Sequence, residues 1–556
     1  MNLTKLASVA AVAIALSACE GGDVNIDASN NSVNTDNSVS TGGGGSNPCA
    51  QYVDPATQNT VQGAFDGTNC NYDSTFVGEA NPLTVSVTIP RIAGAHIFED
   101  SLFVGTNTDA APTPQAPDTP SIDGTVPEGV VLTIRAGARL AWTQSSDYVL
   151  VNRGSQIIAE GSPTAPIIFT SLNDITGTVD PEAVAQWGGI VINGNGITNK
   201  CDDAQRAADA CHVLSEGKPS NFGGNNNAES SGILRYVQVK HTGFEVADGD
   251  ELNGVTFNAV GSGTVVENIQ AYSTSDDGLE FFGGAVNVTN FVGLYVNDDS
   301  LDYADGYVGT ITNALIIHGL NSGNRCIEGD NQGSSGDFNA LPRTSPVVNN
   351  MTCLPSAADA TVRGDSEGPL YRRGVATILT NSIIADSWAR ANLARAGNEC
   401  FEFNNQATYD VAETGTLTNV TSTIIACEEA TKDDSTASFA SGDTLGEWFT
   451  DANGNSTFNT GTAVITDSTN PDIVALNGIY TAPICSDTGC DFVAPGMVTV
   501  NVVPAAATGG ATNANGDPIV GAVSADNDWT AGWTFGLVDT ANGGRLWFNP
   551  STGGTP

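Results

Sequence analysis

SDDGLEFFGG at residues 275–284 is followed by NDDSLDYADGY at 297–307 and RCIEGDNQ at 325–332, and the three phrases share one pattern. In each, a polar turn leads to an apolar residue and then to a carboxylate. NRCIEGDNQ at 324–332 returns almost unchanged as NECFEFNNQ at 398–406. A repeat of about twenty residues predicts a solenoid. The matching pairs are Leu279-Glu280, Leu301-Asp302, Ile327-Glu328 and Phe401-Glu402.

An asparagine recurs between these phrases, each time before an apolar run. Its spacing ranges from 22 residues (268 to 290) to 38 residues (381 to 419), which indicates bare coils and coils with inserted loops. The apolar runs are short and rich in β-branched and aromatic residues, which favours strands. Coils of several short strands predict a parallel β-helix, and the asparagines then form a side-chain ladder. The row contains Asn268, Asn290, Asn313, Asn350, Asn381 and Asn419.

The same register predicts where the repeated pairs point. Leu301 and Ile327 are expected to face the interior of the solenoid, while the carboxylates beside them form a row on its surface. In this row Arg372 is expected to lie between two glutamates and to neutralise them. The predicted order of the row is Glu280, Asp302, Glu328, Arg372 and Glu402.

The first 18 residues have the pattern of an export signal: Lys5 precedes an apolar run that is too short to span a bilayer. The run ends in Leu16-Ser17-Ala18-Cys19, which resembles the bacterial lipobox and implies that Cys19 carries lipid. An ordinary signal peptide with a chance cysteine is the alternative. Glu20 after the cysteine, by resemblance to sorted lipoproteins, implies the outer membrane. Residues 19–48 are polar and of low complexity, which predicts a flexible tether.

Ten cysteines remain after Cys19, an even number that predicts disulfides in an exported chain. We expect neighbours in sequence to pair. The rival pair Cys326–Cys400 would span two coils, about 9.6 Å, which exceeds the reach of a disulfide. The expected pairs are Cys49–Cys70, Cys201–Cys211, Cys326–Cys353, Cys400–Cys427 and Cys485–Cys490.

Composition narrows the possible partners. Sixty-two acidic residues oppose 19 basic ones, a net charge of −43, although charged residues make up only 15% of the chain. Such a surface repels nucleic acid and attracts divalent cations, so we expect no nucleic-acid partner. A solvated acidic coat is the simplest interpretation of the charge.

The solenoid is expected at residues 126–495, with a cap at 49–125 and a second cap at 496–556. Strand edges at the ends of a solenoid need such caps. The C-terminal cap is rich in tryptophan, with Trp529, Trp533 and Trp547 close together. These side chains most simply cover the last coil, and a platform for sugar rings is the alternative.

The stretches WGGIVINGNG, SGILRYVQVKHTG and GVTFNAVGSGTVVENIQAYSTSDDGLEFFGG resemble a group of exported bacterial β-helix lipoproteins. This resemblance covers most of residues 126–440. It implies a right-handed, pectate-lyase-like parallel β-helix, and thus an all-β fold, but it implies no activity.

A narrower resemblance concerns chemistry. Polygalacturonase-type glycosidases place one aspartate and then an aspartate pair on successive coils, and Asp277, Asp298 and Asp299 are similar. By this resemblance the three are candidate catalytic residues, since inverting glycosidases need an acid and a base. The Gly-His-Gly and Arg-x-Lys of that family have no counterparts here. If the protein is an enzyme, we expect a glycoside hydrolase or polysaccharide lyase.

Seven carboxylates in two adjacent coils repel one another unless cations or protons compensate. Calcium prefers such oxygen-rich sites, so a structural calcium site is the leading interpretation. A solvated acidic ridge is the second interpretation and a catalytic pair the third. The candidate metal ligands are Asp276, Asp277, Glu280, Asp298, Asp299, Asp302 and Asp305.

Together these patterns predict a lipid-anchored outer-membrane protein, on the periplasmic face or the cell surface. We expect it to bind glycan or a partner protein, with calcium stiffening the acidic coils. A polysaccharide-degrading enzyme and a structural envelope component are the alternatives.

Lipidation at Cys19 gives the first testable prediction. Cys19→Ser should move the protein from the membrane fraction to the soluble fraction, because the acyl chains would be its only stable anchor. Detergent-free fractionation of cells expressing either form measures this. Equal membrane association of both forms would contradict the prediction.

Overall fold

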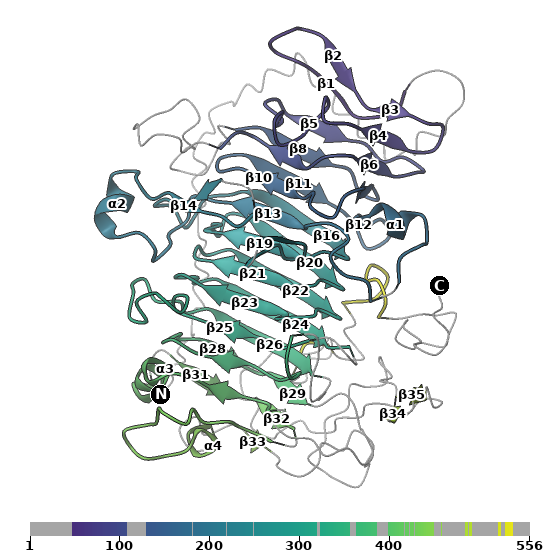
Figure 1. Ribbon diagram of the computed structural model, residues 1–556. Coiled ribbons are helices and arrows are strands. Elements are labelled where there is room, and N and C mark those ends of the chain that lie inside the picture. Colours follow the sequence, from purple (N-terminus) through teal and green to yellow (C-terminus); the bar gives the residue numbers. More distant parts are fainter. Residues whose placement is uncertain are drawn as a thin grey trace, which may run out of the picture. The chain divides into compact units, whose positions relative to one another are not determined.

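Short parallel strands stack coil upon coil in two sheets (Figure 1). This computed structural model describes residues 47–107, 129–180, 182–217, 220–247, 249–319, 323–355, 363–385, 399–415, 418–421, 423–427, 429–449, 521–523 and 529–537, and the backbone of three short strands between 457 and 491. All of them belong to one compact unit. The fold is an all-β parallel β-helix, as predicted.

The first sheet takes one short strand from each coil. Its members pair in parallel, in chain order, and it carries the repeated pairs of the sequence. The strands are β7 (Leu102–Val104), β10 (Val149–Val151), β13 (Ile190–Asn193), β19 (Val255–Asn258), β21 (Leu279–Phe282), β23 (Leu301–Ala304), β25 (Glu328–Gly329), β27 (Leu370–Tyr371) and β30 (Glu402–Phe403).

The second sheet is bent. Strand β16 pairs with β11 along its first half and with β12 along its second half, so one long strand continues two short ones. The strands are β5 (Val87–Ile89), β6 (His96–Phe98), β8 (Val131–Ile134), β9 (Arg139–Trp142), β11 (Gln156–Glu160), β12 (Ile167–Ser171), β16 (Gly232–Lys240), β20 (Val265–Tyr272), β22 (Asn287–Leu294), β24 (Thr310–Ile317), β26 (Val347–Leu354), β28 (Ile378–Thr380), β29 (Ile383–Ala385), β31 (Asn419–Thr421), β32 (Ile424–Ala426) and β33 (Thr457–Phe458).

The bend lies at the predicted asparagine row. The backbone of Asn268, Asn290 and Asn313 has φ of +56°, +63° and +59°, the left-handed region that asparagine tolerates better than most residues. Asn290 Nδ2 donates to Asn268 Oδ1 over 3.0 Å, and Asn313 Nδ2 donates to Asn290 Oδ1 over 2.9 Å. The ladder is therefore real over these three coils, and Asn350 and Asn381 continue the same conformation.

Asn419 is not part of this row. In the register of β28 and β31 it lies opposite Ile378, three residues before the position of Asn381. The prediction was wrong here because the inserted loops vary in length, so counting from one asparagine to the next does not fix the register.

Apolar residues of the repeated pairs fill the interior, as predicted. Leu279, Leu301 and Ile327 are fully buried in one continuous apolar cluster that runs through the coils. Aromatic rings stack along the same axis, for example Phe257 on Phe281 with ring centroids 5.2 Å apart.

The carboxylate row departs from the prediction at one coil. Glu280, Asp302 and Glu328 are in register, but the next position belongs to Leu370 and not to Arg372. Arg372 lies two residues further along, and its guanidinium reaches back to Glu328 and Asp330. It therefore neutralises the row from beside it.

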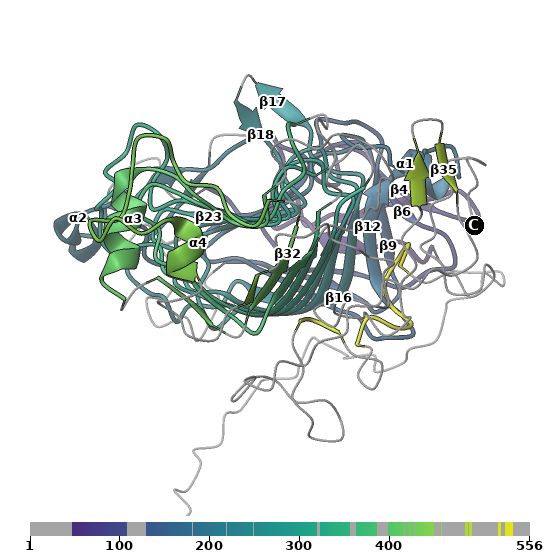
Figure 2. The same cartoon turned by 90° about the horizontal axis from the view of Figure 1, so that it is seen from below.

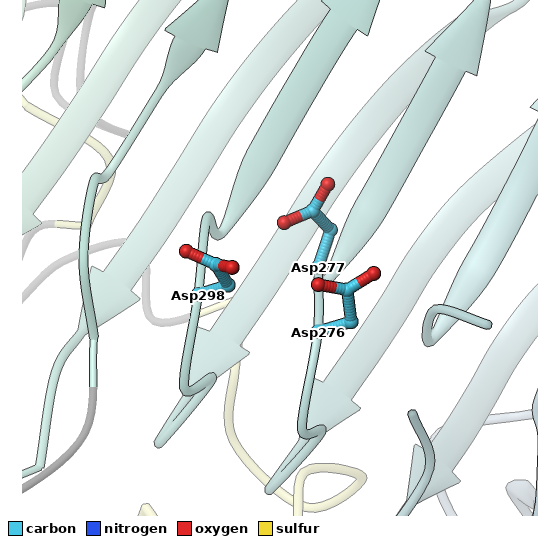
Figure 3. Close-up of side chains that lie close together, drawn as sticks. All are labelled: Asp276, Asp277 and Asp298. Atoms are coloured by element: carbon cyan, nitrogen blue, oxygen red, sulfur yellow. The ribbon is translucent and has the colours of Figure 1, made fainter. Parts of the chain in front are cut away.

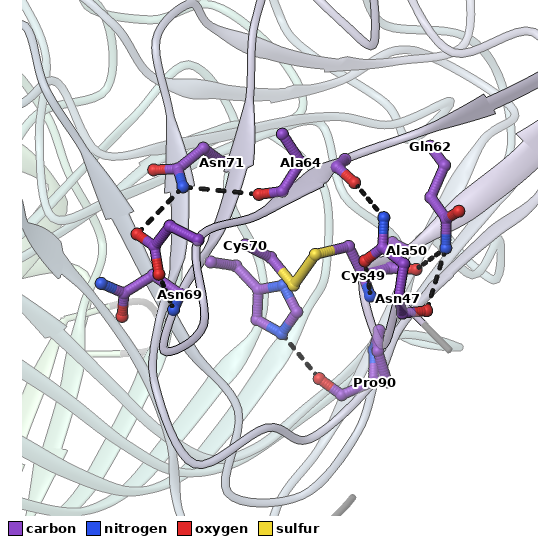
Figure 4. Close-up of a disulfide and its surroundings, with 12 residues drawn as sticks. Asn47, Cys49, Ala50, Gln62, Ala64, Asn69, Cys70, Asn71 and Pro90 are labelled. Carbon is purple, nitrogen blue, oxygen red and sulfur yellow. Dashed lines mark hydrogen bonds between the residues drawn. A yellow bond between two sulfur atoms is a disulfide. The ribbon is translucent and has the colours of Figure 1, made fainter. Parts of the chain in front are cut away.

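Hairpins close the N-terminal end. β1 (Gln51–Val53) pairs with β2 (Thr60–Gln62), and β3 (Ala64–Phe65) pairs with β4 (Cys70–Tyr72). The disulfide Cys49–Cys70 ties them together (Figure 4). Parallel pairing begins before the predicted boundary at residue 126, because β5, β6 and β7 already pair with β8, β9 and β10.

Aromatic side chains after the last strand of the first sheet cover the C-terminal end of that sheet. Phe439, Trp448 and Phe449 pack on Phe401 and Phe403. The expectation that Trp533 covers the last coil is wrong, because Trp533 lies against Tyr236 of β16, several coils earlier. Trp529 Nε1 donates to the carbonyl of Ala522. Trp547 lies outside the described residues.

Insertions and helices complete the chain. The helices are α1 (Leu172–Ile175), α2 (Asp203–Ala207), α3 (Gln406–Glu413) and α4 (Leu445–Glu447), and three further hairpins are β14 (Val213–Leu214) with β15 (Asn221–Phe222), β17 (Glu245–Ala247) with β18 (Asp250–Glu251), and β34 (Ile484–Ser486) with β35 (Gly489–Asp491). Within the described parts of the chain, no helix is long and apolar enough to cross a membrane.

Disulfides join sequence neighbours, as predicted. Four are formed, with Cα–Cα separations from 5.4 to 6.0 Å. The side chains of Cys485 and Cys490 lie outside the described residues, although the two positions face each other in a hairpin. The four bonds are Cys49–Cys70, Cys201–Cys211, Cys326–Cys353 and Cys400–Cys427.

The asparagine ladder gives the second prediction. Asn290→Ala should lower the free energy of unfolding by about 2–4 kcal/mol, because it removes two hydrogen bonds and because alanine tolerates the left-handed conformation less well than asparagine. Asn290→Gly should cost clearly less, since glycine adopts this conformation freely. Urea denaturation measures both. Equal losses for alanine and glycine would show that the backbone conformation carries no cost.

Candidate functional site

The acidic residues lie on the first sheet and in the turns that lead into it. Strands β21, β23 and β25 place Glu280, Asp302 and Glu328 side by side on the outer surface, because successive coils stack in register. The turns before β21 and β23 bring Asp276 and Asp277 against Asp298 (Figure 3). Chain folding therefore assembles the cluster that the sequence predicted.

Three overlapping groups of carboxylates have oxygens within 4.8 Å of one another, and they share Asp277 and Asp302. Six of the seven predicted ligands belong to them. Asp305 does not, in the described part of the chain, because it forms an ion pair with Lys200 at 3.3 Å. Glu328 joins instead. The groups are Asp276, Asp277 and Asp298; Asp277, Glu280 and Asp302; and Asp299, Asp302 and Glu328.

Asp277 and Asp299 hold neighbouring coils together. Asp277 Oδ1 accepts from the backbone N–H of Asp299 over 3.0 Å, and Asp299 Oδ1 accepts from that of Arg325 over 2.8 Å. Asn253 starts this series by accepting from the N–H of Asp277. Asp277 and Asp299 are 6% and 5% exposed. They therefore act first as backbone caps, each with its second oxygen left for another partner.

Asp276 and Asp298 form the more open part of the cluster. Their side chains are 14% and 22% exposed, and each lies near the guanidinium of Arg363, at 3.5 and 3.6 Å. Arg363 is shared with Glu251 of the β17–β18 hairpin, at 2.6 Å. One arginine therefore serves three carboxylates, which leaves this end of the face strongly negative.

Burial and mutual repulsion raise the pKa values across the face. Burial, followed by repulsion from Glu251, raises the pKa of Asp276 to about 9. Burial raises the pKa of Asp298 to about 6 and that of Asp302 to about 7, although nearby arginines oppose the rise. The pKa values of Asp277, Glu280 and Asp299 lie well above the ordinary range for the same reasons.

Two insertions add acidic groups that the sequence did not point to. Glu216, beside the β14–β15 hairpin, has its pKa raised to about 8 by burial and by repulsion from Asp250 and Asp302. Glu251 comes from the β17–β18 hairpin, which projects from the coils (Figure 2). Both residues lie in insertions outside the repeated phrases, so only the folded chain shows that they belong to the face.

Cations gather at later coils. Arg325 pairs with Glu367 and, at 3.0 Å, with Glu402, while Lys432 lies 3.5 Å from both Glu399 and Glu402. Two cations therefore face the three carboxylates of a fourth group, Glu367, Glu399 and Glu402, and compensate most of its charge. The group around Asp277 and Glu280 has no such cation among its described neighbours within ion-pair distance.

This arrangement fits a hard divalent cation. The donors are carboxylate oxygens from adjacent coils, which calcium prefers, and no thiolate or imidazole joins the groups in the described residues. A bound dication would relieve the repulsion that raises the pKa values. Asp276, Asp277, Glu280, Asp298 and Asp302 are the residues that would hold it.

The candidate catalytic residues fit a glycosidase less well. Asp277 and Asp299 are buried and accept backbone N–H groups, and Asp298 contacts Arg363. An inverting reaction needs a free acid and a free base on opposite sides of the bond that breaks. His318, the histidine nearest in sequence to the pair Asp298 and Asp299, is buried beside Ser366.

Comparison with known proteins agrees with the fold. A family model described as a pectate-lyase-like beta helix domain matches residues 119–466, more than half of the chain. No curated protein and no solved structure gives a significant match.

The raised pKa values give the third prediction. With a chelator present, the free energy of unfolding should fall as the pH rises from about 4 to about 9, by a few kcal/mol or more. The carboxylates of the face bind more protons in the folded chain than in the unfolded chain in this window, so their deprotonation favours unfolding. Burial lowers the pKa values of His96, His241 and His318, which opposes the fall below about pH 6.5. Urea denaturation across the pH range measures this.

Asp302→Asn should flatten that slope, because an amide does not titrate. Asp443→Asn, at an exposed aspartate, is the matched control and should leave the slope unchanged. Stability that stays level or rises between pH 5 and 8 in chelator would contradict the buried, repelling cluster.

Proposed function

The chain belongs to the pectate-lyase-like β-helix family, and on that premise we propose that it is a lipid-anchored outer-membrane protein that binds glycan through its acidic face, with calcium. Family membership fits a polysaccharide-related role in general. The proposed binding of calcium and glycan rests on the acidic face, and the proposed lipid anchor rests on the N-terminal sequence.

One observation carries the proposal: the carboxylates of successive coils crowd together with too few cations to balance them. In each of the three overlapping groups, the carboxylate oxygens lie within 4.8 Å of one another. In the described chain, Arg363 is the cation within ion-pair distance of Asp276 and Asp298. Calcium would supply the missing positive charge there. The face would then be stable with its carboxylates ionised, at neutral pH.

Calcium also explains how such a face could hold a glycan. A chain with a net charge of −43 repels an acidic polysaccharide, unless a dication bridges carboxylates of the two partners. Calcium accepts six to eight oxygen ligands, more than three carboxylates supply with one oxygen each, so ligand oxygens can complete the shell. Acidic polysaccharides are therefore the favoured class of ligand.

The proposed location at the outer membrane rests on the N-terminal sequence, which lies outside the described residues. A lipidated Cys19 and the polar tether of residues 19–48 would leave the solenoid free beside the outer membrane. Either face of the membrane satisfies this arrangement.

The alternative is a hydrolase or lyase acting on the same polymers, which the family name favours. The hydrogen bonds that Asp277 and Asp299 accept from the backbone weigh against it, because these carboxylates already have a structural task.

Calcium-dependent binding gives the fourth prediction. Calcium at about 100 times its Kd should stabilise the wild-type protein by about 2.7 kcal/mol and enable binding of polygalacturonate, a representative acidic polymer. Asp298→Asn should raise the Kd for calcium about tenfold and thereby weaken both the stabilisation and the binding of polygalacturonate. Asp443→Asn should change neither. Thermal unfolding and isothermal titration calorimetry measure the two effects.

The enzyme alternative is tested in the same samples. We expect no release of reducing ends or unsaturated sugars, with or without calcium. Sustained turnover that is lost in both Asp277→Asn and Asp299→Asn would replace the binding proposal by a hydrolase or lyase. An unfolding curve that calcium does not move would exclude the metal site.

A further inference from the structure

The second halves of the long strands present an unusual outer surface. Side chains alternate along a strand, so β16, β20, β22, β24 and β26 each turn two residues away from the core. Registered pairing aligns these residues in two rows, and we call this surface the flank. The rows are Gln238, Gln270, Val292, Leu315 and Thr352, and Lys240, Tyr272, Leu294, Ile317 and Leu354.

All ten flank residues are buried, although none belongs to the interior cluster. Two outward rows that contain Val292, Leu294 and Leu315 would otherwise form a large exposed apolar patch, which soluble proteins avoid unless it binds something. Two C-terminal pieces, residues 521–523 and 529–537, contact this surface (Figure 2, yellow). At its edge, Lys240 also forms an ion pair with Asp174 of α1 at 2.6 Å, and Tyr272 stands edge-on to His241 and Tyr295.

Side-chain amides of the flank form hydrogen bonds with the backbone of the second piece, residues 529–537. Gln270 Nε2 donates to the carbonyl of Phe535 over 2.7 Å, while Gln270 Oε1 accepts from its N–H, also over 2.7 Å. On the neighbouring strand, Gln238 Nε2 donates to the carbonyl of Trp533. Two adjacent glutamines therefore bind alternate residues of one segment.

Aromatic contacts add side-chain selectivity. The Phe535 ring lies 3.9 Å from Lys240 Nζ and stands edge-on to Tyr272, with ring centroids 4.8 Å apart. The Trp533 ring stands edge-on to Tyr236 at 5.8 Å and is 1% exposed. These contacts distinguish an aromatic residue at each position from an aliphatic one.

Gly536 fixes the path of the segment. A β-carbon at this position would lie 3.1 Å from Tyr272 and 3.2 Å from Leu294, and its φ of +78° disfavours other residues. The segment thus passes from β16 at Trp533 to β20 at Phe535 and on toward β22. It crosses the strands instead of pairing with them, so the glutamine amides and the rings supply the recognition.

We propose that the flank is a recognition site for a turn-forming peptide of the pattern Trp-x-Phe-Gly, which the chain fills with its own residues 529–537 as a releasable latch. In the described residues, the latch contacts the solenoid through side-chain hydrogen bonds and rings, with no strand pairing and no disulfide. Release requires only that these contacts break. The occupant in the resting protein is the chain's own segment.

Hydrogen exchange on the full-length chain tests the latch. Gln270→Ala removes both amide hydrogen bonds to Phe535, so exchange across residues 529–537 should rise about tenfold while strands β20 and β22 stay protected. Gln144→Ala, at an exposed glutamine, is the matched control and should change nothing. Unchanged exchange at 529–537 in Gln270→Ala would overturn the proposal.

A peptide supplied in trans tests the site itself. The double variant Trp533→Ser, Phe535→Ser should vacate the flank, and a fluorescent peptide WTAGWTFGL should then bind it but not the wild-type chain. Adding Gln270→Leu should abolish this binding, and a scrambled peptide should not bind. No binding to a folded double variant, or equal binding to wild type, would overturn the proposal; should the double variant not fold, the exchange experiment decides.

Discussion

In-register stacking of equivalent residues, about 4.8 Å apart, is the constraint on which this protein depends. A residue type that recurs in the repeat must be able to lie beside its own copy. Asparagine can, because one side chain both donates and accepts, and Asn268, Asn290 and Asn313 do so. Carboxylates cannot, because ionised they only accept. Each carboxylate row therefore needs backbone amides, arginines, protons or a cation as partners. In this chain, backbone amides and arginines are distributed unevenly among the coils.

This uneven compensation separates the acidic face into two parts. Around Glu367, Glu399 and Glu402, the two cations Arg325 and Lys432 offset most of the charge within the chain. Around Asp276 and Asp298, one arginine is shared by three carboxylates. A purely structural row would need the same balance at every coil. The coils that lack it are the natural place for an external partner, and they are also the coils next to the two acidic insertions.

Sequence alone predicted the fold, the interior positions of Leu301 and Ile327, and the meeting of the acidic turns, because all three depend on the period of the repeat. It failed where insertions of unequal length hide that period, so Leu370 occupies the position expected for Arg372, and Asn419 lies outside the ladder. Contacts between distant segments carried no signal. Glu216 at the acidic face and Trp533 on the flank are examples, because neither period nor composition says where an inserted loop or a terminal segment returns to the coils.

The disulfides have a consequence for how the folded chain responds to proteolysis. Each bond connects cysteines that enclose a single stretch of chain, such as the loop between Cys326 and Cys353 or helix α3 between Cys400 and Cys427. A protease that cuts an exposed loop inside such a stretch leaves the two fragments covalently joined, and the stacked strands on both sides hold their places. The protein would be nicked but whole, and its fragments would separate only under reducing and denaturing conditions.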